Sequence, residues 1–299
     1  MTQLIEPVRR VIMTPDFRAA TGNRGAVNPA QFIRPVKAVE AEPKIIESDE
    51  AIQARIRERF SVMDDLIKMS IGGKARGLVI SGPAGVGKSH NVKRNLSVIS
   101  DDRYTISTGF IRATGLYRLL YNHRGKDNVI VFDDSDSLFL VEDSLNLLKN
   151  ALDTNDERIL SWRAETNMKD DAGDALPTEF LFEGSIIFIT NKDFDAMIAN
   201  NDKFSVHYEA FISRSYYIDL AMRSRRDYLI RIKDVIDNEG MLSDKLNPNQ
   251  IKEVLSYIET NLYTLREVSL RIAGKIAGIM NEFPNSWERN CNVTCRKAY

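Results

Sequence analysis

The chain has 299 residues, of which 43% are hydrophobic, so it is long enough for about two domains with a substantial core. Its 41 Lys and Arg residues balance 42 Asp and Glu residues, and the net charge of −1 excludes a protein that is basic over its whole surface. Both cysteines lie near the C-terminus, which excludes a disulfide framework. No signal peptide and no bilayer-spanning apolar run is visible. We therefore expect a soluble, cytoplasmic protein (in the host cytoplasm if it is viral) without membrane contact.

Residues 1–46 are predicted to form a flexible basic arm. Five of the nine prolines lie within the first 43 residues, and the stretch shows neither a helical nor a strand period. Residues 1–37 carry six basic and two acidic side chains, which gives this segment a charge of +4. The arm is interpreted either as a tether for nucleic acid or a partner, or as a solvated tail.

The ordered part of the chain is predicted to begin near Ser48. Ile52, Ile56, Phe60, Met63 and Ile67 follow one another at helical spacing, and the predicted helix ends at Gly72-Gly73. Five strand-sized apolar runs then alternate with helical stretches: Gly77–Ser81, Tyr104–Thr108, Asn128–Phe132, Ser185–Thr190 and Ser215–Leu220. Such runs are typical of a parallel sheet covered by helices on both faces.

After Arg223 the strand pattern disappears, and three helices are predicted near residues 223–238, 248–260 and 265–281. The predicted fold class is α/β: a parallel five-stranded αβα sandwich of the P-loop type, followed by a small all-helical lid domain. We expect the core to span residues 47–222, the lid residues 223–285 and a C-terminal tail residues 286–299.

One segment matches the pattern G-x-x-x-x-G-K-[ST] at every fixed position: Gly82-Pro83-Ala84-Gly85-Val86-Gly87-Lys88-Ser89. It follows the first predicted strand directly and precedes a helical stretch. Its glycines let successive backbone N–H groups face a phosphate, and the helix N-terminus adds partial positive charge. Lys88 is expected to bind the β- and γ-phosphates of ATP, and the Ser89 hydroxyl to bind Mg²⁺. The alternative, a glycine-rich turn without a ligand, explains less of this pattern.

Two other predicted strands end in polar side chains. The strand at 128–132 is followed by Asp133 and Asp134, and the strand at 185–190 by Asn191. The carboxyl ends of neighbouring parallel strands converge on the ligand crevice. Asp133 is therefore a candidate Mg²⁺ ligand, Asp134 a candidate base that polarises the attacking water, and Asn191 a candidate to hold that water. Acidic or amide turns without a ligand are the alternative interpretation.

Together these segments resemble the AAA+ ATPases over roughly residues 45–282. Gly82–Ser89 is similar to the Walker A motif, Asp133–Phe139 to the Walker B stretch, and Thr190-Asn191 to sensor 1. Ala210–Ser215 resembles the Ser-Arg-Cys arginine-finger region of clamp loaders, and Tyr263–Arg266 resembles sensor 2. The order and spacing of the five segments is more specific than any one of them.

The resemblance implies roles for two arginines. Arg214 would act in trans on the nucleotide of a neighbouring subunit, which implies a homo-oligomer in a ring or open ring, with a hexamer expected. Arg266 would reach the phosphates from the helical lid. Neighbouring arginines are rivals for these roles: Arg223, Arg225 and Arg226 for the first, and Arg271 for the second.

The Walker B stretch departs from the family in one respect, because Asp133-Asp134 stands where most members have Asp-Glu. The shorter side chain requires the attacking water to lie closer or to be bridged. Initiators and helicase loaders also carry Asp-Asp and hydrolyse ATP, so the resemblance still implies turnover and favours nucleic-acid-associated relatives.

Three further features bear on what the protein acts upon. Arg158–Arg163 and Glu179–Phe182 alternate like strands, which predicts a β-hairpin inserted before the sensor 1 strand. Phe110 follows the second strand and is either a substrate-contacting pore-loop residue or, by the more common behaviour of a lone aromatic, part of the core. Cys291 and Cys295 are interpreted as free thiols, since a structural zinc site needs four ligands.

The expected function is that of an oligomeric ATPase that uses Mg-ATP hydrolysis to remodel a nucleic-acid complex, as a loader, initiator or replication accessory. A protein remodeller or unfoldase and a nucleotide-gated switch with little turnover are the alternatives. The expected cofactors are ATP and Mg²⁺, and the expected partners are copies of the chain and a nucleic acid or protein substrate. The small, unadorned core would suit a phage or mobile-element protein.

Overall fold

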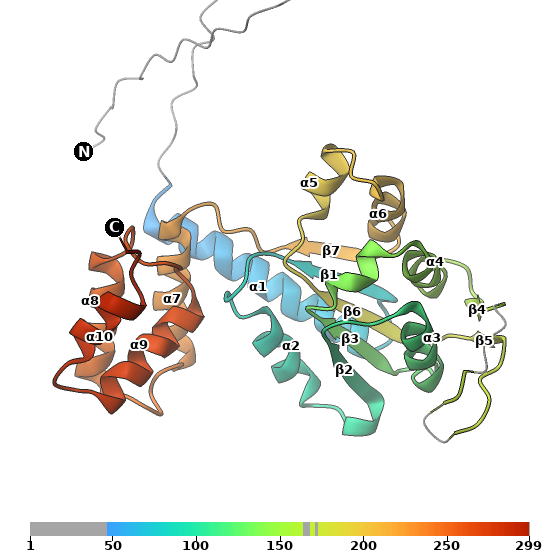
Figure 1. Ribbon diagram of the computed structural model, residues 1–299, viewed down its shortest axis with the longest axis horizontal. Helices are drawn as coiled ribbons and strands as arrows, with labels where there is room; N and C mark the ends of the chain where they lie inside the picture. Colours follow the sequence, from blue (N-terminus) through green and yellow to red (C-terminus); the bar gives the residue numbers. More distant parts are fainter. Residues whose placement is uncertain (1–46, 164–167, 171–172, 299) are drawn as a thin grey trace, which may run out of the picture. The chain divides into compact units, whose positions relative to one another are not determined.

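The computed structural model describes residues 47–163, 168–170 and 173–298. The predicted arm at 1–46 lies outside the described residues, as does part of the predicted hairpin loop. The described part of the chain begins with the long helix α1 (Asp49–Ile71; Figure 1). Ser48 caps its first turn, because the Ser48 hydroxyl accepts a hydrogen bond from the Ala51 N–H at 3.2 Å.

The central sheet has five strands, all parallel: β1 (Gly77–Ser81), β2 (Tyr104–Thr108), β3 (Val129–Asp133), β6 (Ser185–Ile189) and β7 (Tyr216–Asp219). Their order is β2-β3-β6-β1-β7, so β6 lies between β3 and β1. Each of these strands was predicted, with bounds that differ by at most one residue. The chain segments that follow β3, β6 and β1 are therefore neighbours at one edge of the sheet.

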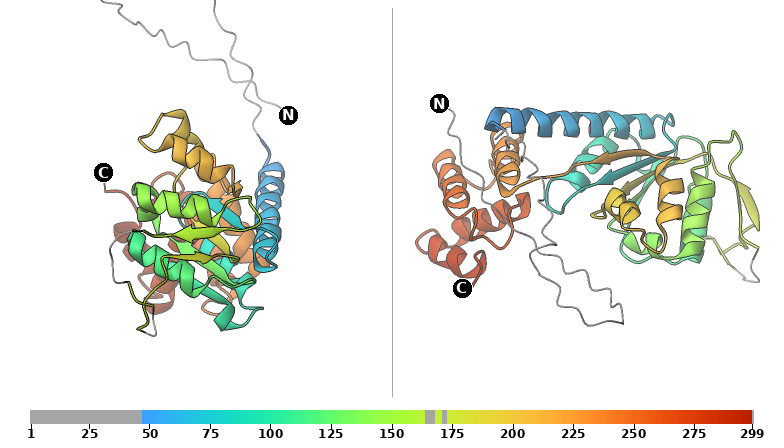
Figure 2. Two further views of the ribbon diagram at one scale, coloured as in Figure 1. Left: turned by 90° about the vertical axis from the view of Figure 1, so that its right-hand side faces the viewer. Right: turned by 90° about the horizontal axis from the view of Figure 1, so that it is seen from above.

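Helices cover both faces of the sheet, as the apolar runs predicted. Alternate strand residues point to opposite faces, so Val79 packs with α3 (Ala113–Asn122) and α4 (Glu142–Ala151), whereas Leu78 packs with α1 and α2 (Lys88–Leu96). Figure 2 shows α1 along one face and the green helices α3 and α4 on the other. The short helices α5 (Phe194–Ala199) and α6 (Ser205–Ile212) pack into the apolar core on the side of α3 and α4. Two 3₁₀ turns span Asp101–Arg103 and Asp136–Leu140.

The predicted hairpin is present as an antiparallel pair, β4 (Ile159–Ser161) and β5 (Glu179–Leu181). Leu160 and Phe180 lie opposite each other and are buried against the α3–α4 core. Ile159 and Leu181 form the next pair and are exposed on the other face. The hairpin therefore packs through one face and leaves two apolar side chains at the surface.

The C-terminal part consists of α7 (Arg225–Glu239), α8 (Pro248–Thr260), α9 (Leu270–Glu282) and α10 (Trp287–Thr294), which share one apolar core. The segment at 286–299, expected to be a tail, contains α10. Trp287, Cys291 and Cys295 recur every fourth residue, and this face of α10 is buried in the helical core. Both thiols are free, and burial raises the pKa of Cys291 to about 12.

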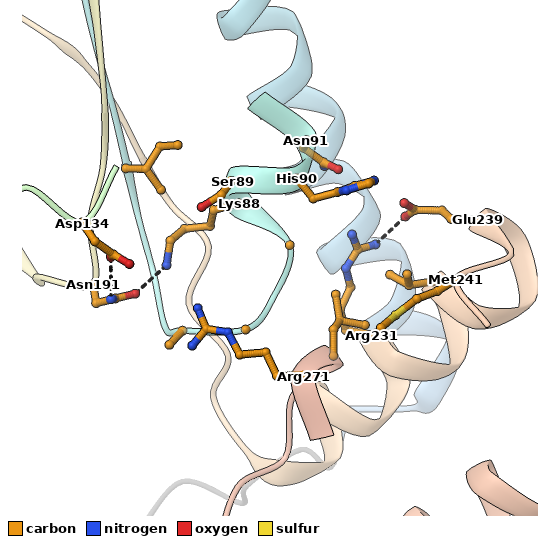
Figure 3. A pocket seen from close by; sticks show the side chains of 16 residues that line it. Lys88, Ser89, His90, Asn91, Asp134, Asn191, Arg231, Glu239, Met241 and Arg271 are labelled. Carbon is orange, nitrogen blue, oxygen red and sulfur yellow. Dashed lines mark hydrogen bonds and ion pairs between the residues drawn. The ribbon is translucent and has the colours of Figure 1, made fainter. Parts of the chain in front are cut away.

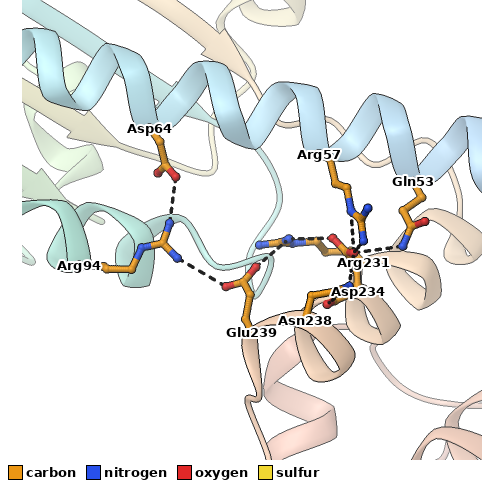
Figure 4. Close-up of polar contacts among 8 residues, drawn as sticks. All are labelled: Gln53, Arg57, Asp64, Arg94, Arg231, Asp234, Asn238 and Glu239. Carbon is orange, nitrogen blue, oxygen red and sulfur yellow. Dashed lines mark hydrogen bonds and ion pairs between the residues drawn. The ribbon is translucent and has the colours of Figure 1, made fainter.

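Helix α1 is joined to α7 by a buried polar cluster (Figure 4). Asp234 accepts hydrogen bonds from Arg57 Nε at 2.8 Å, from Gln53 Nε2 at 3.0 Å and from Asn238 Nδ2 at 2.9 Å. Arg231 forms an ion pair with Asp234 at 3.5 Å, and its guanidinium lies 3.8 Å from the centre of the Phe60 ring. Both Asp234 and Arg231 are almost fully buried. Asp234 also pairs with Arg57, and Arg231 also pairs with Glu239 at 3.2 Å, so two opposite charges compensate each of them.

Replacing Asp234 with alanine is expected to lower the free energy of unfolding by about 3–5 kcal/mol, because Arg231 would lose a partner in a buried site. Asp237→Ala, one residue of the same type on the exposed face of α7, is the matched control and should change stability by less than about 0.5 kcal/mol. Urea denaturation of both variants measures the difference. Equal stabilities would show that the cluster contributes nothing to the α1–α7 packing.

Candidate nucleotide-binding site

The glycine-rich loop Gly82–Ser89 follows β1 and ends in the first two residues of α2. Its backbone takes left-handed conformations that only glycine adopts readily, with φ of 76° at Gly85 and 108° at Gly87. A Cβ at Gly85 would lie 2.7 Å from Cβ of Ser269, which caps α9. The Leu270 N–H also donates a hydrogen bond to the Gly85 carbonyl at 2.9 Å. The loop is therefore packed against the start of α9, and no larger residue fits at Gly85.

Lys88 is buried at the start of α2 and is held by oxygen atoms of the chain itself. Its Nζ donates to the Gly82 carbonyl at 2.5 Å, to the Pro83 carbonyl at 2.9 Å and to Asn191 Oδ1 at 2.8 Å. Burial is the largest influence on this amine and lowers its pKa to about 8, although the nearby carboxylates raise it. The lowered pKa indicates that the nearby carboxylates do not fully compensate the buried ammonium group. A phosphate group would add the missing negative charge.

The strand order explains how three separate sequence motifs meet. Asn191 follows β6, which lies between the strands that carry the loop and the carboxylates. The Asn191 side chain bridges Lys88 and Asp134, because its Oδ1 accepts a hydrogen bond from Lys88 Nζ and its Nδ2 donates one to Asp134 Oδ1 at 3.1 Å. Asp134 has a left-handed backbone with φ of 55°, which is uncommon for a residue other than glycine. Such strain concentrates at functional sites, and here it accompanies the turn that carries this carboxylate.

Ser89 and Asp133 form a pair of oxygen groups beside this row. The Ser89 hydroxyl donates to Asp133 Oδ1 at 2.9 Å. A hydroxyl and a carboxylate in contact, next to a phosphate-binding loop, fit Mg²⁺, which takes one or two protein oxygens together with water and phosphate oxygens. Asp136 faces elsewhere in the same turn, since it accepts a hydrogen bond from Thr190 Oγ1 at 2.6 Å.

These residues open into a cavity of about 440 Å³, which is within the range of small-molecule sites (Figure 3). The sequence-predicted residues on its wall are Ala84, Gly85, Gly87, Lys88, Ser89, Asp134 and Asn191. Arg271, named above as the rival of Arg266, also lies on the wall. The other wall residues were not predicted: His90, Asn91, Ile189, Arg231, Val235, Glu239, Met241 and Leu270. Most of these come from α2, α7 and the start of α9, so the C-terminal helices supply much of one wall.

The structure distinguishes the two candidate arginines of the helical part. Arg271 is the second residue of α9 and lines the cavity with Lys88 (Figure 3). Arg266 was expected to open the third lid helix, but that helix begins at Leu270, after the Ser269 cap. Arg266 lies instead beside a different hollow, formed by α9 and Cys295. The geometry therefore corrects the expectation for Arg266 and favours its rival Arg271 as the cation near the loop.

Arg214 lies outside the cavity of its own chain, between α6 and β7. Its Nη1 donates to the Ala210 carbonyl at 2.7 Å, and its Nε lies 3.9 Å from a carboxylate oxygen of Asp153. Two of its rivals have partners elsewhere: Arg225 donates to the Leu262 carbonyl at 2.6 Å, and Arg226 pairs with Asp49 at the start of α1. Arg214 is partly exposed and is not among the residues that line the cavity with Lys88, Asp134 and Asn191.

Phe110 is 75% exposed, which overturns the expectation that this lone aromatic belongs to the core. It follows Gly109, which has a φ of 82° and no atom within 4 Å of a Cβ placed there. The turn after β2 therefore directs Phe110 into solvent. In the described ranges, no group of His, Cys, Asp and Glu residues could hold a further metal ion, and no helix is long and apolar enough to cross a membrane.

No protein-family model matches the chain. It is 35% identical over 249 residues to an uncharacterised 36.7 kDa protein of Enterobacteria phage T4, from the nrdC–mobD intergenic region, and the match covers 82% of this chain and 76% of that protein. Among solved structures, the RuvB Holliday junction branch migration motor of Thermotoga maritima matches with a TM-score of 0.44 and 13% identity, over 83% of this chain and 72% of that one. NtrX of Brucella abortus in complex with ATP matches with a TM-score of 0.43 and 12% identity, over 80% of this chain and 53% of that one. Because both scores are below 0.5, the AAA+ fold is assigned from this chain's own strand order, loop and C-terminal helices.

Proposed function

The chain belongs to the family of the uncharacterised 36.7 kDa phage T4 protein and has the AAA+ fold, and from this premise we propose that it is an oligomeric, Mg²⁺-dependent ATPase. Lys88 and the loop Gly82–Ser89 bind the phosphates of ATP. Ser89 and Asp133 hold Mg²⁺, which when bound neutralises charge on the phosphate oxygens. Asp134 polarises the attacking water and Asn191 orients it.

One observation carries this proposal: the unbroken row of hydrogen bonds from Lys88 through Asn191 to Asp134, with the Ser89–Asp133 pair beside it. A phosphate-binding cation, a polar amide and a carboxylate base are the groups that attack on a terminal phosphate requires. A merely structural ion pair between Lys88 and Asp134 would not need an amide between them. The row supports hydrolysis rather than nucleotide binding alone.

The substrate that we propose for this ATPase is a nucleic-acid complex. The Asp133-Asp134 pair and the Ser213-Arg214-Ser215 segment resemble the initiator, helicase-loader and clamp-loader branches, and residues 1–37 carry a charge of +4. Phosphate-directed contacts from such a segment would be independent of nucleotide sequence and sensitive to salt.

The experiment measures ATP hydrolysis and oligomer mass with Mg²⁺, with and without saturating single-stranded or duplex DNA. We expect hydrolysis to require Mg²⁺, and DNA to raise the rate or to change the oligomer mass in a manner that falls with added salt. An unchanged rate and an unchanged mass with both forms of DNA would contradict the nucleic-acid part. The Mg²⁺-dependent rate without DNA tests the ATPase part separately.

The exposure of Phe110 favours a second candidate, a protein remodeller. An exposed aromatic side chain next to a glycine with a left-handed backbone can bind an unfolded polypeptide through apolar contact. Phe110→Ala should then lower the processing of an unfolded model protein such as casein and leave basal hydrolysis intact. Val98→Ala, which removes another exposed apolar side chain, is the control. Equal processing by both variants would eliminate this candidate.

The two arginines of the helical part make a matched pair for testing the lid. Arg271→Ala is expected to weaken ATP binding by about tenfold or more, because a hydrogen bond to a charged group contributes about 1.5–3 kcal/mol. Arg266→Ala removes the same charge four residues before α9 and should change affinity by less than about twofold. Calorimetric titration with Mg-ATP distinguishes them. A larger loss for Arg266→Ala would restore the role that the family resemblance implied.

A further inference from the structure

The cavity continues past the phosphate-binding loop into a second half. Figure 3 shows Lys88, Asp134 and Asn191 on one side of the loop, and Asn91, Arg231, Glu239 and Met241 on the other. A nucleotide whose phosphates lie on Lys88 extends its nucleoside away from Asn191. The half lined by α2 and α7 is thus the part of the cavity available to a base.

This second half is suited to a planar ring with a polar edge. Val235, Met241 and Leu270 supply apolar surface for the ring faces. Asn91 lies three residues after Lys88 on α2 and belongs to the wall of the same cavity. Arg231 is fixed over the Phe60 ring and paired with Asp234, which leaves its guanidinium little freedom to move.

Two buried polar atoms here have no hydrogen-bond partner among the described residues. Asn91 is 3% exposed and its Oδ1 accepts nothing, whereas Arg231 is 4% exposed and its Nε donates to nothing. A buried polar atom without a partner is energetically unfavourable and is rare in folded proteins. One of the two atoms is an acceptor and the other a donor. A ligand edge that offers one donor and one acceptor would satisfy both.

We propose that Asn91 selects adenine nucleotides by accepting a hydrogen bond from the 6-amino group of the base, while Arg231 Nε donates to a ring nitrogen. The inference rests on the nucleotide binding proposed above and adds the residue that reads the base. A 6-oxo purine would face Asn91 Oδ1 with a second acceptor, leaving two lone pairs opposed. A site built to hydrogen-bond one group of a ligand binds an analogue without that group more weakly, because its own polar atom is then left without a partner.

The nearby carboxylate does not favour guanine. Glu239 would be the natural acceptor for the N1–H and 2-amino groups of guanine. It is already paired with Arg231 at 3.2 Å and lies 3.8 Å from Arg94. Its charge is therefore compensated by two guanidinium groups, and Asn91 Oδ1 remains the unpartnered acceptor of this wall.

The test compares ATP with purine riboside 5′-triphosphate, which lacks only the 6-amino group, and with ITP, which has an oxygen there. Binding is measured by calorimetry with Mg²⁺ on the full chain carrying Asp134→Asn, so that the nucleotide is not consumed. With Asn91 present, we expect ATP to bind about tenfold more tightly than purine riboside triphosphate, as for one hydrogen bond, and ITP to bind more weakly still.

Asn91→Ala should weaken ATP binding by the same factor and leave purine riboside triphosphate unchanged within about twofold. The matched control is Asn95→Ala, one helical turn further along α2, whose amide donates to Asp64 at 3.0 Å and lies outside the cavity wall. It should leave the preference among the three nucleotides intact. Circular dichroism of each variant verifies that the helices are retained.

The results separate this inference from the proposed function. Equal binding of ATP and purine riboside triphosphate, or an equal loss of both in Asn91→Ala, would overturn the inference while nucleotide binding stands. A preference for ITP or GTP would overturn it as well, because the amide nitrogen would then face the base. A folded protein that binds none of these nucleotides would instead overturn the proposed function.

Discussion

Replacing Asp134 with asparagine is expected to lower the rate of ATP hydrolysis by about 10²–10⁴-fold, because the side chain can no longer take up a proton from the attacking water. Asparagine keeps an oxygen that can accept the hydrogen bond from Asn191 Nδ2. The geometry of the row should therefore persist, and ATP should bind with an affinity within about threefold of the unchanged chain. Steady-state hydrolysis and calorimetric binding measure the two effects separately.

Asp136→Asn is the matched control for that experiment. Asp136 lies two residues further along the same turn, and its asparagine variant keeps an acceptor for Thr190 Oγ1. It removes the same charge without touching the row from Lys88 to Asp134, and we expect hydrolysis to fall by less than about threefold. An Asp134→Asn variant with unchanged turnover would contradict the catalytic role. A negligible rate in the unchanged chain would favour the nucleotide-gated switch.

Much of the fold is visible in the sequence because its elements carry strong local signals. The three inner strands β1, β3 and β6 are buried along their whole length and are mostly apolar, and that pattern arises when both faces of a parallel sheet are covered. The start of α1 was predicted equally well, since the Ser48 cap is a local hydrogen bond. The phosphate-binding loop is local too, because its shape depends on glycines within one short segment.

The rest of the cavity wall could not be predicted from local sequence patterns. Arg231, Glu239 and Met241 reach the loop only through the packing of α7 against α1, which no local pattern encodes. One signal was available: Arg231 stands between Ile230 and Ile232, and a charge inside an apolar stretch points to a buried partner.

Two residues were misplaced, one of them because a helix begins later than its sequence period indicates. The helical period alone started the third lid helix near residue 265 and put Arg266 at its opening. Ser269 is the actual cap, accepting a hydrogen bond from the Ile272 N–H at 3.3 Å, so Arg271 takes that place. Phe110 was misplaced for another reason, since average burial was applied to a residue that follows a left-handed glycine.

Replacing Arg214 with alanine is expected to lower hydrolysis by about 10³–10⁵-fold, the range observed when an arginine finger is absent. ATP binding should be nearly unchanged, because Arg214 does not line the cavity of its own chain. Arg118→Ala, at an exposed position on α3, is the control for the loss of one surface charge and should keep full activity.

A mixing experiment tests whether this arginine acts between subunits. Arg214→Ala chains keep a complete nucleotide site, and Lys88→Ala chains keep the arginine, so each variant alone should be inactive. In a mixed oligomer, some interfaces combine the intact site of one chain with the arginine of the other, and hydrolysis should return to a sizeable fraction of the original rate. Subunit exchange is followed by energy transfer between labelled chains. If the chains exchange and activity does not return, Arg214 acts within its own subunit or not at all, and the interfacial site is wrong.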